Sequence, residues 1–324
     1  KVNESDLEDG IYKGLLEGLN DPYSVYYTAE EYRKMMEQTS GTYSGIGALV
    51  SQNAETGIIT VVKAFADAPA AKAGVKNGDI IYKVKGKEVT GVDINNVVTE
   101  MKGEKGTTVD ITVYRESEKK YIDFTITRDQ VNEPTVEYKM LDKKKKIGYI
   151  QISQFEEVTY DQFTKALDDL KKQGMKAVIF DVRSNPGGLY ETVCKMLDEI
   201  LPEGNLVSTK DKYGNEEKQT SDSKCLDMPM VVLQNKDSAS ASEIFAGAIQ
   251  DFNAGKIVGT QSFGKGIVQT ILPLSDGSAV KLTVQDYYTP SGKNIHGKGI
   301  TPDVEVELEE NATSDTQLEK AKET

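Results

Sequence analysis

The distribution of apolar residues changes along the chain, and its last part has the most regular pattern. From about residue 146, short apolar runs alternate with longer segments in which apolar residues recur at helical spacing. This alternation predicts an α/β sheet with helices on its faces. The expected strands are Ile147–Ile152, Ala177–Asp181 and Met230–Gln234, completed by Lys256–Gly259, Ile267–Leu272 and Val280–Tyr288. The expected helices are Tyr160–Gln173, Leu189–Leu201 and Ala239–Phe252.

Residues 41–128 have a different rhythm, in which glycines separate short strand-like runs. These runs surround two helix-like pieces, Pro69–Gly74 and Asn95–Lys102. This order predicts a small, partly open β-barrel domain. The expected strands are Ile46–Val50, Ile58–Val62, Asp79–Val84, Val109–Tyr114 and Tyr121–Ile126.

Two amphipathic segments precede this domain. Apolar residues at helical spacing predict a helix over residues 5–19, and Thr28 begins a second helical stretch that ends near Gln38. Two short helices cannot form a core alone, so they must pack on the rest of the chain or on a partner. The predicted divisions are an N-terminal helical segment (1–40), a β-rich domain (41–128), an α/β core (129–310) and a C-terminal helix or tail (311–324).

Composition narrows the class of protein. The chain has 324 residues and a net charge of −13, concentrated at its two ends. An acidic chain repels phosphate backbones and anionic lipids, which disfavours nucleic-acid binding. No apolar run approaches the roughly 18 residues that a membrane span needs. The chain opens without an apolar stretch, so we expect a cytoplasmic protein or one whose leader precedes this sequence.

Histidine and cysteine are scarce, which excludes several kinds of site. A structural zinc site needs four Cys or His ligands, but the chain has only Cys194, Cys225 and His296. We therefore expect no metal and no cofactor. A Ser-His-Asp triad would have to use His296, which lies in a loop-like, glycine-rich stretch. The cysteines leave a disulfide and free thiols equally open.

Two loops follow predicted strands of the α/β core. The strand ending at Asp181 leads into Arg183-Ser184-Asn185-Pro186-Gly187-Gly188, and the strand Met230–Gln234 leads into Ser238-Ala239-Ser240-Ala241-Ser242-Glu243. Ligand sites form at this edge of an open α/β sheet. The serine run opens a helix whose N–H groups can stabilise an oxyanion. The alternative is that the serines only cap the helix.

Lys265 is the candidate base. It lies between Gly264 and Gly266 and close to the apolar residues Phe263 and Ile267, and such surroundings disfavour the ammonium form. A solvated loop lysine is the alternative. The segment also nearly matches a Walker A loop, but Gly266 stands where Ser or Thr would bind magnesium.

Two segments of the β-rich domain resemble PDZ domains. Residues 43–48 (Tyr-Ser-Gly-Ile-Gly-Ala) look like the PDZ carboxylate-binding loop, and residues 68–81 are similar to the PDZ helix-turn-strand signature. A glycine loop with consecutive N–H groups suits a carboxylate, and an exposed strand edge suits a peptide. The alternative is a glycine-rich hairpin without a ligand. The resemblance implies a loop formed by Gly45, Ile46 and Gly47 and a groove lined by Val97, Val98 and Met101.

The whole constellation resembles the C-terminal processing, or tail-specific, serine peptidases. The resemblance runs from Leu19–Ser24 through the PDZ-like part, residues 181–188, Ser238–Asp251 and Gly264–Gly266 to Gly299–Asp303, about nine-tenths of the chain. It implies a crotonase- or ClpP-like α/β peptidase core.

The resemblance also assigns roles to residues. It implies that Ser240 is the nucleophile, Lys265 the general base and Gln269 the residue that orients the lysine. The oxyanion hole would use the N–H groups of Ala241 and of Gly187 or Gly188. The implied reaction proceeds through an acyl-enzyme that water hydrolyses.

The resemblance further implies partners and a location. Substrates would be unfolded or flexible protein C-termini, the terminal segments would form a homodimer, and a regulatory partner is a further candidate. The expected location is outside the cytoplasm, in the bacterial cell envelope. Arg115 is a candidate for gating contact between the PDZ-like and catalytic parts, with a structural surface arginine as the alternative. Rival functions are a non-catalytic tail-binding scaffold and a nucleotide-dependent enzyme.

Overall fold

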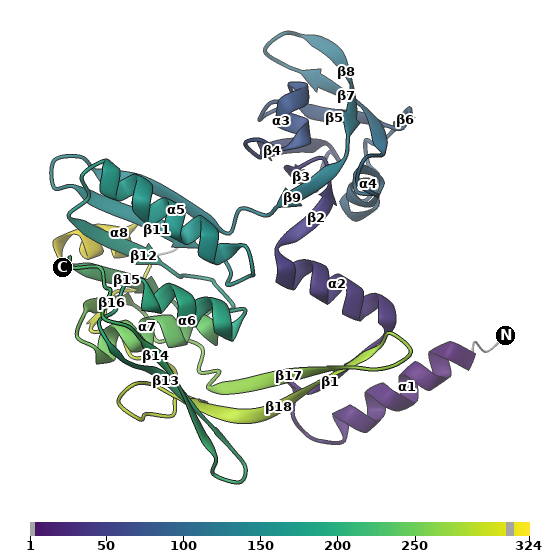
Figure 1. Ribbon diagram of the computed structural model, residues 1–324. Coiled ribbons are helices and arrows are strands. Elements are labelled where there is room, and N and C mark those ends of the chain that lie inside the picture. Colours follow the sequence, from purple (N-terminus) through teal and green to yellow (C-terminus); the bar gives the residue numbers. More distant parts are fainter. Residues whose placement is uncertain (1–3, 309–313) are drawn as a thin grey trace. The chain divides into compact units, whose positions relative to one another are not determined.

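A computed structural model describes residues 4–308 and 314–324 (Figure 1). The predictions for residues 1–3 and 309–313 lie outside the described residues. The chain forms two compact units: Gly41–Pro134, and a second unit made of Lys1–Ser40 with Thr135–Thr324.

The unit Gly41–Pro134 is a β-domain with two helices. Its main sheet has the order β3-β4-β5-β7-β8, all antiparallel, with β6 added to β5, and a separate two-stranded sheet pairs β2 with β9. Alternate residues of β7 are buried, as expected of a strand with one face on a core. The elements are β2 (Thr42–Gly45), β3 (Ala48–Gln52), β4 (Ile59–Ala64), α3 (Pro69–Ala73), β5 (Ile80–Val84), β6 (Lys87–Glu88), α4 (Ile94–Met101), β7 (Thr108–Arg115), β8 (Lys120–Thr127) and β9 (Asp129–Asn132).

The end of this unit is set by β9. This strand pairs along its whole length with β2, from Thr42 opposite Asn132 to Gly45 opposite Asp129. The division drawn at residue 128 from the sequence therefore falls at the first residue of a strand that belongs with the β-domain.

The second unit is built on a six-stranded sheet with the order β10-β11-β12-β15-β16-β19. β10 is antiparallel to β11, and all later neighbours are parallel. The predicted α/β class is confirmed. The strands are β10 (Val136–Asp142), β11 (Ile147–Ile152), β12 (Ala177–Asp181), β15 (Met230–Gln234), β16 (Gly255–Gly259) and β19 (Val304–Glu305).

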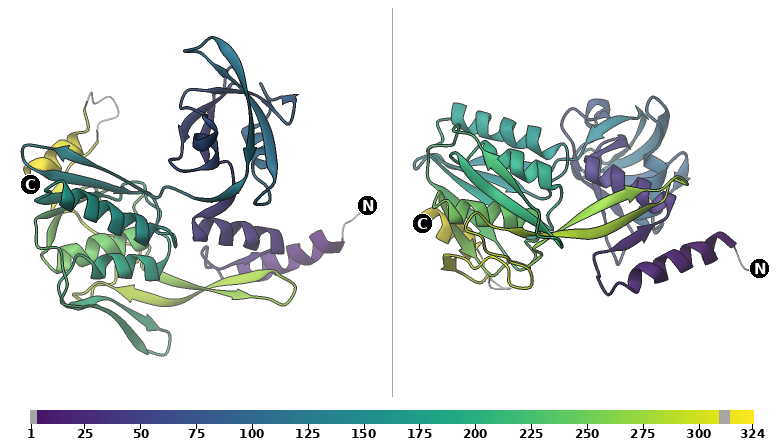
Figure 2. Two further views of the ribbon diagram at one scale, coloured as in Figure 1. Left: turned by 45° about the horizontal axis from the view of Figure 1, so that its top comes forward. Right: turned by 60° about the horizontal axis from the view of Figure 1, so that its bottom comes forward.

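Helices cover both faces of this sheet (Figure 2). α5 (Thr159–Lys172), α6 (Tyr190–Asp198) and α7 (Ala241–Asp251) bury one face in the largest core cluster, where Phe155, Phe163, Phe180 and Phe245 form ring contacts. α8 (Thr316–Glu323) covers the opposite face through Ala321. α7 is buried along nearly its whole length, which fixes its N-terminus within the fold.

A second, antiparallel sheet corrects one expectation from the sequence. The segments expected as Ile267–Leu272 and Val280–Tyr288 do not complete the α/β sheet. They form β17 (Ile267–Pro273) and β18 (Ala279–Tyr288), which pair with each other. β18 also pairs with β1 (Val25–Tyr27) and with β13 (Gly204–Asp211). β13 in turn pairs with β14 (Glu216–Ser221). The physical reason is their exposure. Strands of a helix-covered parallel sheet are buried on both faces, whereas most residues of β17 and β18 are partly or fully exposed.

The N-terminal helices are α1 (Glu4–Glu17) and α2 (Ala29–Ser40). Leu16 of α1 is buried, and Tyr12 contacts the ring of Tyr26 on β1 at 5.1 Å between centroids. Ile11 and Leu15, in contrast, are 68% and 67% exposed. α1 thus packs on β1 along one side and carries apolar side chains in solvent on another. None of the helices in the described ranges is long and apolar enough to span a membrane.

Candidate active site

The serine run between β15 and α7 holds three hydroxyl groups with different surroundings. Ser238 Oγ donates to the carbonyl of Val182 at 2.7 Å, and Ser242 Oγ donates to the carbonyl of Asn185 at 2.9 Å. Both serines are buried. Ser240 is half-buried, and within the described residues its hydroxyl donates to no acceptor. The flanking serines therefore stabilise the loops, and Ser240 keeps its proton available.

The backbone of Ser240 is strained. Its φ of 57° and ψ of −115° lie where side chains other than glycine are uncommon, and such a residue costs about 1–3 kcal/mol. Its N–H donates to Glu243 Oε2 at 2.9 Å, and its carbonyl accepts from the hydroxyl of Tyr287 at 3.2 Å. These bonds hold Ser240 at the N-terminus of α7, where the helix N–H groups favour negative charge.

The loop after β12 touches this serine. A Cβ on Gly187 would lie 2.8 Å from the carbonyl oxygen of Ala239 and 2.9 Å from Ser240 Cβ, so only glycine fits. Asn185 is fully buried and holds the loop, because its Nδ2 donates to the Ile152 carbonyl at 2.8 Å. The two loops expected at one sheet edge are thus in contact.

The N–H groups near Ser240 differ in their availability. The Gly187 N–H donates to Asn185 Oδ1 at 2.8 Å. Among the described residues, the N–H groups of Gly188 and Ala241 have no acceptor. Gly188 has φ of 142° and is packed so tightly against the Phe155 backbone that a Cβ would lie 2.2 Å from its carbonyl oxygen.

Lys265 follows β16 in a loop between two glycines. Burial lowers the pKa of its ammonium group, and the charge of Lys281 on β18 lowers it further, while Asp21 and Glu243 act in the opposite direction. Its Nζ lies 4.9 Å from the centroid of the Tyr23 ring. No hydrogen bond joins Nζ to Ser240 Oγ in the described part of the chain.

Glu243 connects the loop of Ser240 to the loop of Lys265, and it was not among the site residues predicted from the sequence. Its buried carboxylate accepts hydrogen bonds at Oε2 from the N–H groups of Ser240 (2.9 Å) and Lys265 (2.8 Å). Its Oε1 accepts from Ser262 Oγ at 2.5 Å and from the Gly264 N–H at 2.7 Å. The spacing of Ser240 and Glu243, that of an N-cap and a third helical residue, is the signal that could have indicated it.

Gln269 lies on β17, immediately after a break in register with β18. Its Nε2 is buried, and in the described ranges it has no hydrogen-bond partner. A buried amide without a partner costs free energy, so the group is available to a neighbour that moves.

Tight packing explains the glycines that flank Lys265. A Cβ on Gly266 would lie 2.6 Å from the backbone nitrogen of His296, and one on Gly264 would lie 2.9 Å from that of Lys298. No space remains for the Ser or Thr of a Walker A loop at position 266. His296 itself is exposed, and within the described residues no hydrogen bond joins it to Ser240.

Arg183 anchors the loop that carries Gly187 and Gly188. Its guanidinium donates to Asp181 at 2.6 Å and to both oxygens of Asp315 at 2.8 and 2.9 Å. Asp315 is the N-cap of α8 and also accepts from the Leu318 N–H at 2.9 Å. The terminal helix is thereby tied to the loop beside Ser240.

The PDZ-like carboxylate loop has free donors. The N–H groups of Ile46 and Gly47 have no acceptor among the described residues, and Gly47 has φ of 75°. A Cβ on Gly47 would lie 2.3 Å from Ala68 Cβ, so glycine is required. The Ser44 hydroxyl, immediately before the loop, is buried and unpartnered in the same part of the chain. This arrangement can accept an anion.

The predicted groove residues on α4 differ in exposure. Val97 and Met101 are 2% and 4% exposed and belong to the core of the β-domain, as does Ile46, whereas Val98 is partly exposed and packs against that core. Of the three α4 side chains, Val98 alone offers surface to a peptide.

Arg115 is engaged inside the β-domain. Its Nε and one terminal nitrogen donate to the Asp79 carboxylate at 2.8 and 2.7 Å, and the same terminal nitrogen donates to the Gly74 carbonyl at 2.8 Å. Arg115 and Asp79 are both buried. This geometry favours the structural reading of Arg115, and its role in gating stays a prediction.

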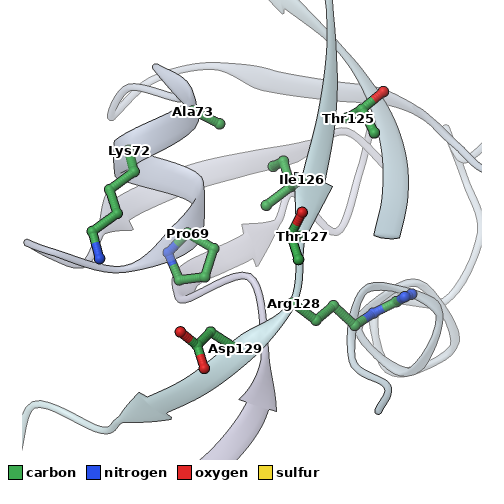
Figure 3. A pocket seen from close by; sticks show the side chains of 8 residues that line it. All are labelled: Pro69, Lys72, Ala73, Thr125, Ile126, Thr127, Arg128 and Asp129. Atoms are coloured by element: carbon green, nitrogen blue, oxygen red, sulfur yellow. The ribbon is translucent and has the colours of Figure 1, made fainter. Parts of the chain in front are cut away.

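The β-domain also has a pocket of about 320 Å³ (Figure 3). It lies between α3 and the end of β8, and its lining residue Arg128 donates to the carbonyl of Met101, one of the predicted groove residues on α4, at 3.0 Å. The lining residues are Pro69, Lys72, Ala73, Thr125, Ile126, Thr127, Arg128 and Asp129.

The cysteines are not paired: Cys194 is buried and Cys225 exposed, and both are free thiols. Among the described residues, no group of three or more His, Cys, Asp or Glu side chains is arranged to hold a metal ion.

The sequence and the fold match known proteins. The profile of peptidase family S41 matches residues 146–306, and that of the PDZ domain matches residues 44–126. The chain is 40% identical over 313 residues to a carboxy-terminal-processing protease of Bartonella bacilliformis, covering 94% of this chain and 70% of that protein. It is 39% identical over 310 residues to a probable CtpA-like serine protease of Staphylococcus epidermidis, covering 94% of this chain and 62% of that protein.

Solved structures agree. The photosystem II D1 C-terminal processing protease superposes with a TM-score of 0.58 at 29% identity, covering 98% of this chain and 86% of that chain. A putative S41 protease of Bacteroides fragilis superposes with a TM-score of 0.59, covering 95% and 88%, and its 17% identity shows the fold alone. The family resemblance and the PDZ assignment drawn from the sequence are confirmed: the chain belongs to peptidase family S41, as a serine peptidase of the carboxy-terminal-processing type with a PDZ domain.

Proposed function

We propose that this peptidase cleaves polypeptides with Ser240 as nucleophile and Lys265 as general base. The observation that carries the proposal is the Glu243 carboxylate, whose Oε2 accepts the N–H groups of both residues. This shared acceptor fixes the two backbones relative to each other, so that only the side chains must move to react. The Ser240 hydroxyl, which lies between two engaged serines and donates to no acceptor among the described residues, supports the same assignment.

The proposed reaction has two steps. Neutral Lys265 takes the proton of the Ser240 hydroxyl as Oγ attacks the scissile carbonyl, and the resulting ammonium protonates the leaving amine. Water then attacks the acyl-enzyme with Lys265 again as base. The lowered pKa of Lys265 supports this role because it enlarges the neutral fraction near neutral pH. Gln269 would donate a hydrogen bond from its unpartnered Nε2 to the neutral Nζ once the lysine turns toward Ser240.

The oxyanion would bind to the N–H groups of Ala241 and Gly188. Both are free, and both adjoin Ser240, Ala241 as its neighbour in sequence and Gly188 through the loop that packs against it. Gly187 has a different role in this assignment. Its own N–H donates to Asn185, and its lack of a side chain allows the loop to approach Ser240. Two preorganised donors stabilise a tetrahedral intermediate.

The PDZ domain, a module that binds C-terminal peptides, would recognise the substrate. The free N–H groups of Ile46 and Gly47 would bind the terminal carboxylate, while Gly45 ends β2 and leads the chain into the loop. Val98 would contact an apolar side chain of the tail. The substrates in this account are unfolded or flexible proteins that end in apolar residues.

Assembly and location are also proposals. The exposed apolar side chains of α1 support a homodimer formed through the terminal segment, and a regulatory partner would bind the PDZ domain. We place the protein outside the cytoplasm, in the bacterial cell envelope.

The test incubates the chain with an unfolded protein that ends in apolar residues and follows fragments by mass spectrometry. The parent is expected to cleave, and the Ser240→Ala and Lys265→Ala variants are expected not to. A matched Ser242→Ala variant removes a neighbouring hydroxyl that only binds the Asn185 carbonyl, and we expect it to retain cleavage. Tail binding by the parent without any cleavage would favour the scaffold function and would reject the proposed one.

A further inference from the structure

A segment from the N-terminal part of the chain lies against the base. The Tyr23 ring faces Lys265 Nζ, 4.9 Å from its centroid, although the two residues belong to opposite ends of the sequence. Both lie in the same compact unit. The contact is a cation–π pair, which is worth more when the ammonium is desolvated, and Lys265 is largely buried.

The ring is held by a fixed turn. Asp21 Oδ1 accepts the Tyr23 N–H at 3.1 Å, and its Oδ2 accepts the Ser24 hydroxyl at 2.6 Å. Ser24 Oγ in turn accepts the backbone N–H of Thr283 on β18 at 3.1 Å. Because β18 pairs with β17, the strand that follows Lys265, the turn and the lysine loop are attached to one hairpin.

We propose that Tyr23 is a positioning residue for the base: its ring face holds the ammonium form of Lys265 away from the Ser240 hydroxyl and thereby sets the pH at which the lysine becomes available. This inference rests on the proposed role of Lys265 as general base. It adds a second residue that controls that role, and the controlling feature is the face of the ring, not the phenol hydroxyl.

None of the charged neighbours of Lys265 forms an ion pair with its Nζ in the described part of the chain, so the Tyr23 ring provides its stabilising contact. Lys281 on β18 repels the ammonium, while Asp21 in the turn and Glu243 on α7 attract it. Both oxygens of each carboxylate already accept other hydrogen bonds, from Tyr23 and Ser24 at Asp21 and from four donors at Glu243. In the described part of the chain no carboxylate oxygen lies within ion-pair distance of Lys265 Nζ. The Tyr23 ring is therefore its direct favourable contact.

The experiment measures the pKa of Lys265 without using cleavage. The Ser240→Ala protein is labelled with trace acetic anhydride across a pH series, and acetylation of the Lys265 peptide is quantified by mass spectrometry. Replacing Tyr23 by Leu keeps the site apolar but removes the ring face, so the pKa should fall by about 0.4–1 unit. Tyr23→Phe keeps the face and should leave the pKa within about 0.2 unit of the parent value.

A second series guards against misfolding of the Leu variant. Phenylalanine with one, three or five ring fluorines at position 23 keeps the shape but progressively weakens the face, so the pKa of Lys265 should fall stepwise. An unchanged or raised pKa with Tyr23→Leu, an equal shift with Tyr23→Phe, or no dependence on fluorination would each overturn the inference.

The rate of cleavage separates this inference from the proposed function. In the parent Ser240 background, the rising limb of the kcat/KM profile should move to lower pH with Tyr23→Leu by the same amount as the labelling pKa. If the parent protein cleaves nothing, the proposed function fails while the labelling result still decides the contact between Tyr23 and Lys265. If cleavage occurs but the rising limb of the kcat/KM profile does not shift with the pKa of Lys265 measured by acetylation, Tyr23 does not act through the base and the inference fails.

Discussion

The Glu243 carboxylate accepts the N–H of Ser240 at 2.9 Å, where Ser240 is the half-buried N-cap of α7 and Glu243 is fully buried. The same oxygen accepts the N–H of Lys265. A buried acceptor thus joins the strained turn of the nucleophile to the loop of the base, and the geometry of the pair depends on it.

Glu243→Gln tests this connection. An amide has one acceptor oxygen, so at least one of the N–H groups now bound to Oε2 or Oε1 would face an NH2 group instead. We expect the free energy of unfolding to fall by about 2–4 kcal/mol and kcat to fall by about 100-fold, measured by urea unfolding and peptide cleavage. Glu216→Gln, on an exposed strand, is the matched control and should change neither quantity. Full activity in Glu243→Gln would contradict the account.

The ion pair of Arg183 and Asp315 predicts a pH-dependent contribution to stability. Burial raises the pKa of Asp315, but the hydrogen bonds from Arg183 and from the Leu318 N–H, together with the positive charge of Arg183, outweigh this effect, so the pKa lies below its ordinary value. The stability from this pair is therefore fully present above a pH of about 4 and is lost as the pH falls through the folded-state pKa.

Asp315→Asn should accordingly be less stable than the parent at neutral pH, by about 1–3 kcal/mol, and the difference should shrink as the pH falls below about 4. Chemical unfolding at several pH values measures it. Since Arg183 also anchors the loop of Gly188, cleavage by the variant should be weakened at neutral pH. A stability difference that does not change with pH would show that the pair does not act as described.

Gly187 and Ser240 are so close that a single methyl group should disrupt the site. In Gly187→Ala, the new Cβ would collide with the Ala239 carbonyl and with Ser240, and φ of 108° adds strain. We expect cleavage to fall at least 100-fold, with a stability loss of about 2 kcal/mol or more. Gly14→Ala is the matched control, because its Cβ in α1 meets nothing within 4 Å. That variant should be as stable as the parent or more so.

Arg115 offers a test of its two interpretations. Replacing it by Met leaves the buried Asp79 carboxylate without its ion pair, which should destabilise the β-domain by about 3 kcal/mol or more. Amide hydrogen exchange of β5 and β7 in the intact chain measures this. If exchange is unchanged while cleavage changes, the gating interpretation is favoured over the structural one.

The exposed apolar side of α1 predicts self-association. Ile11→Glu and Leu15→Glu each place a charge on this surface, away from the buried Leu16. Sedimentation should show a dimer for the parent and a monomer for the double variant, with no loss of helix by circular dichroism. A parent that sediments as a monomer at all accessible concentrations would reject the proposed dimer.

The sequence predicted elements best where one strand is buried on both faces. β12 and β15 have the predicted bounds because their apolar runs are nearly continuous and buried, and β11 also has its predicted bounds although Gln151 within it is polar and exposed. β14 could not be predicted, since Glu216–Ser221 is almost entirely polar and exposed and becomes a strand only by pairing with β13. The same holds for the assignment of β17 and β18 to a second sheet, which depends on pairing with distant strands.

The candidate site shows the same limit. Ser240 and Lys265 stand out in the sequence because glycines and a serine run surround them. Glu243 is indicated only by its capping-box spacing from Ser240, while its hydrogen bond from the Lys265 N–H and the contact of Tyr23 with Lys265 arise only when distant parts of the chain meet. The resemblance left Gly187 and Gly188 as alternatives, and our proposal of Gly188 is supported by the hydrogen bond that engages the Gly187 N–H with Asn185, which the sequence does not reveal.

The most direct test of the central claim is to trap the acyl-enzyme. The protein is mixed with an activated ester of an apolar peptide, quenched in acid after milliseconds to seconds, and digested for peptide mapping by mass spectrometry. The account predicts a single acyl adduct on Ser240, formed at least 100-fold more slowly in Lys265→Met and absent from Ser240→Ala. An adduct on Ser238, Ser242 or another nucleophile, or acylation of Ser240 at an undiminished rate without Lys265, would contradict the Ser–Lys assignment.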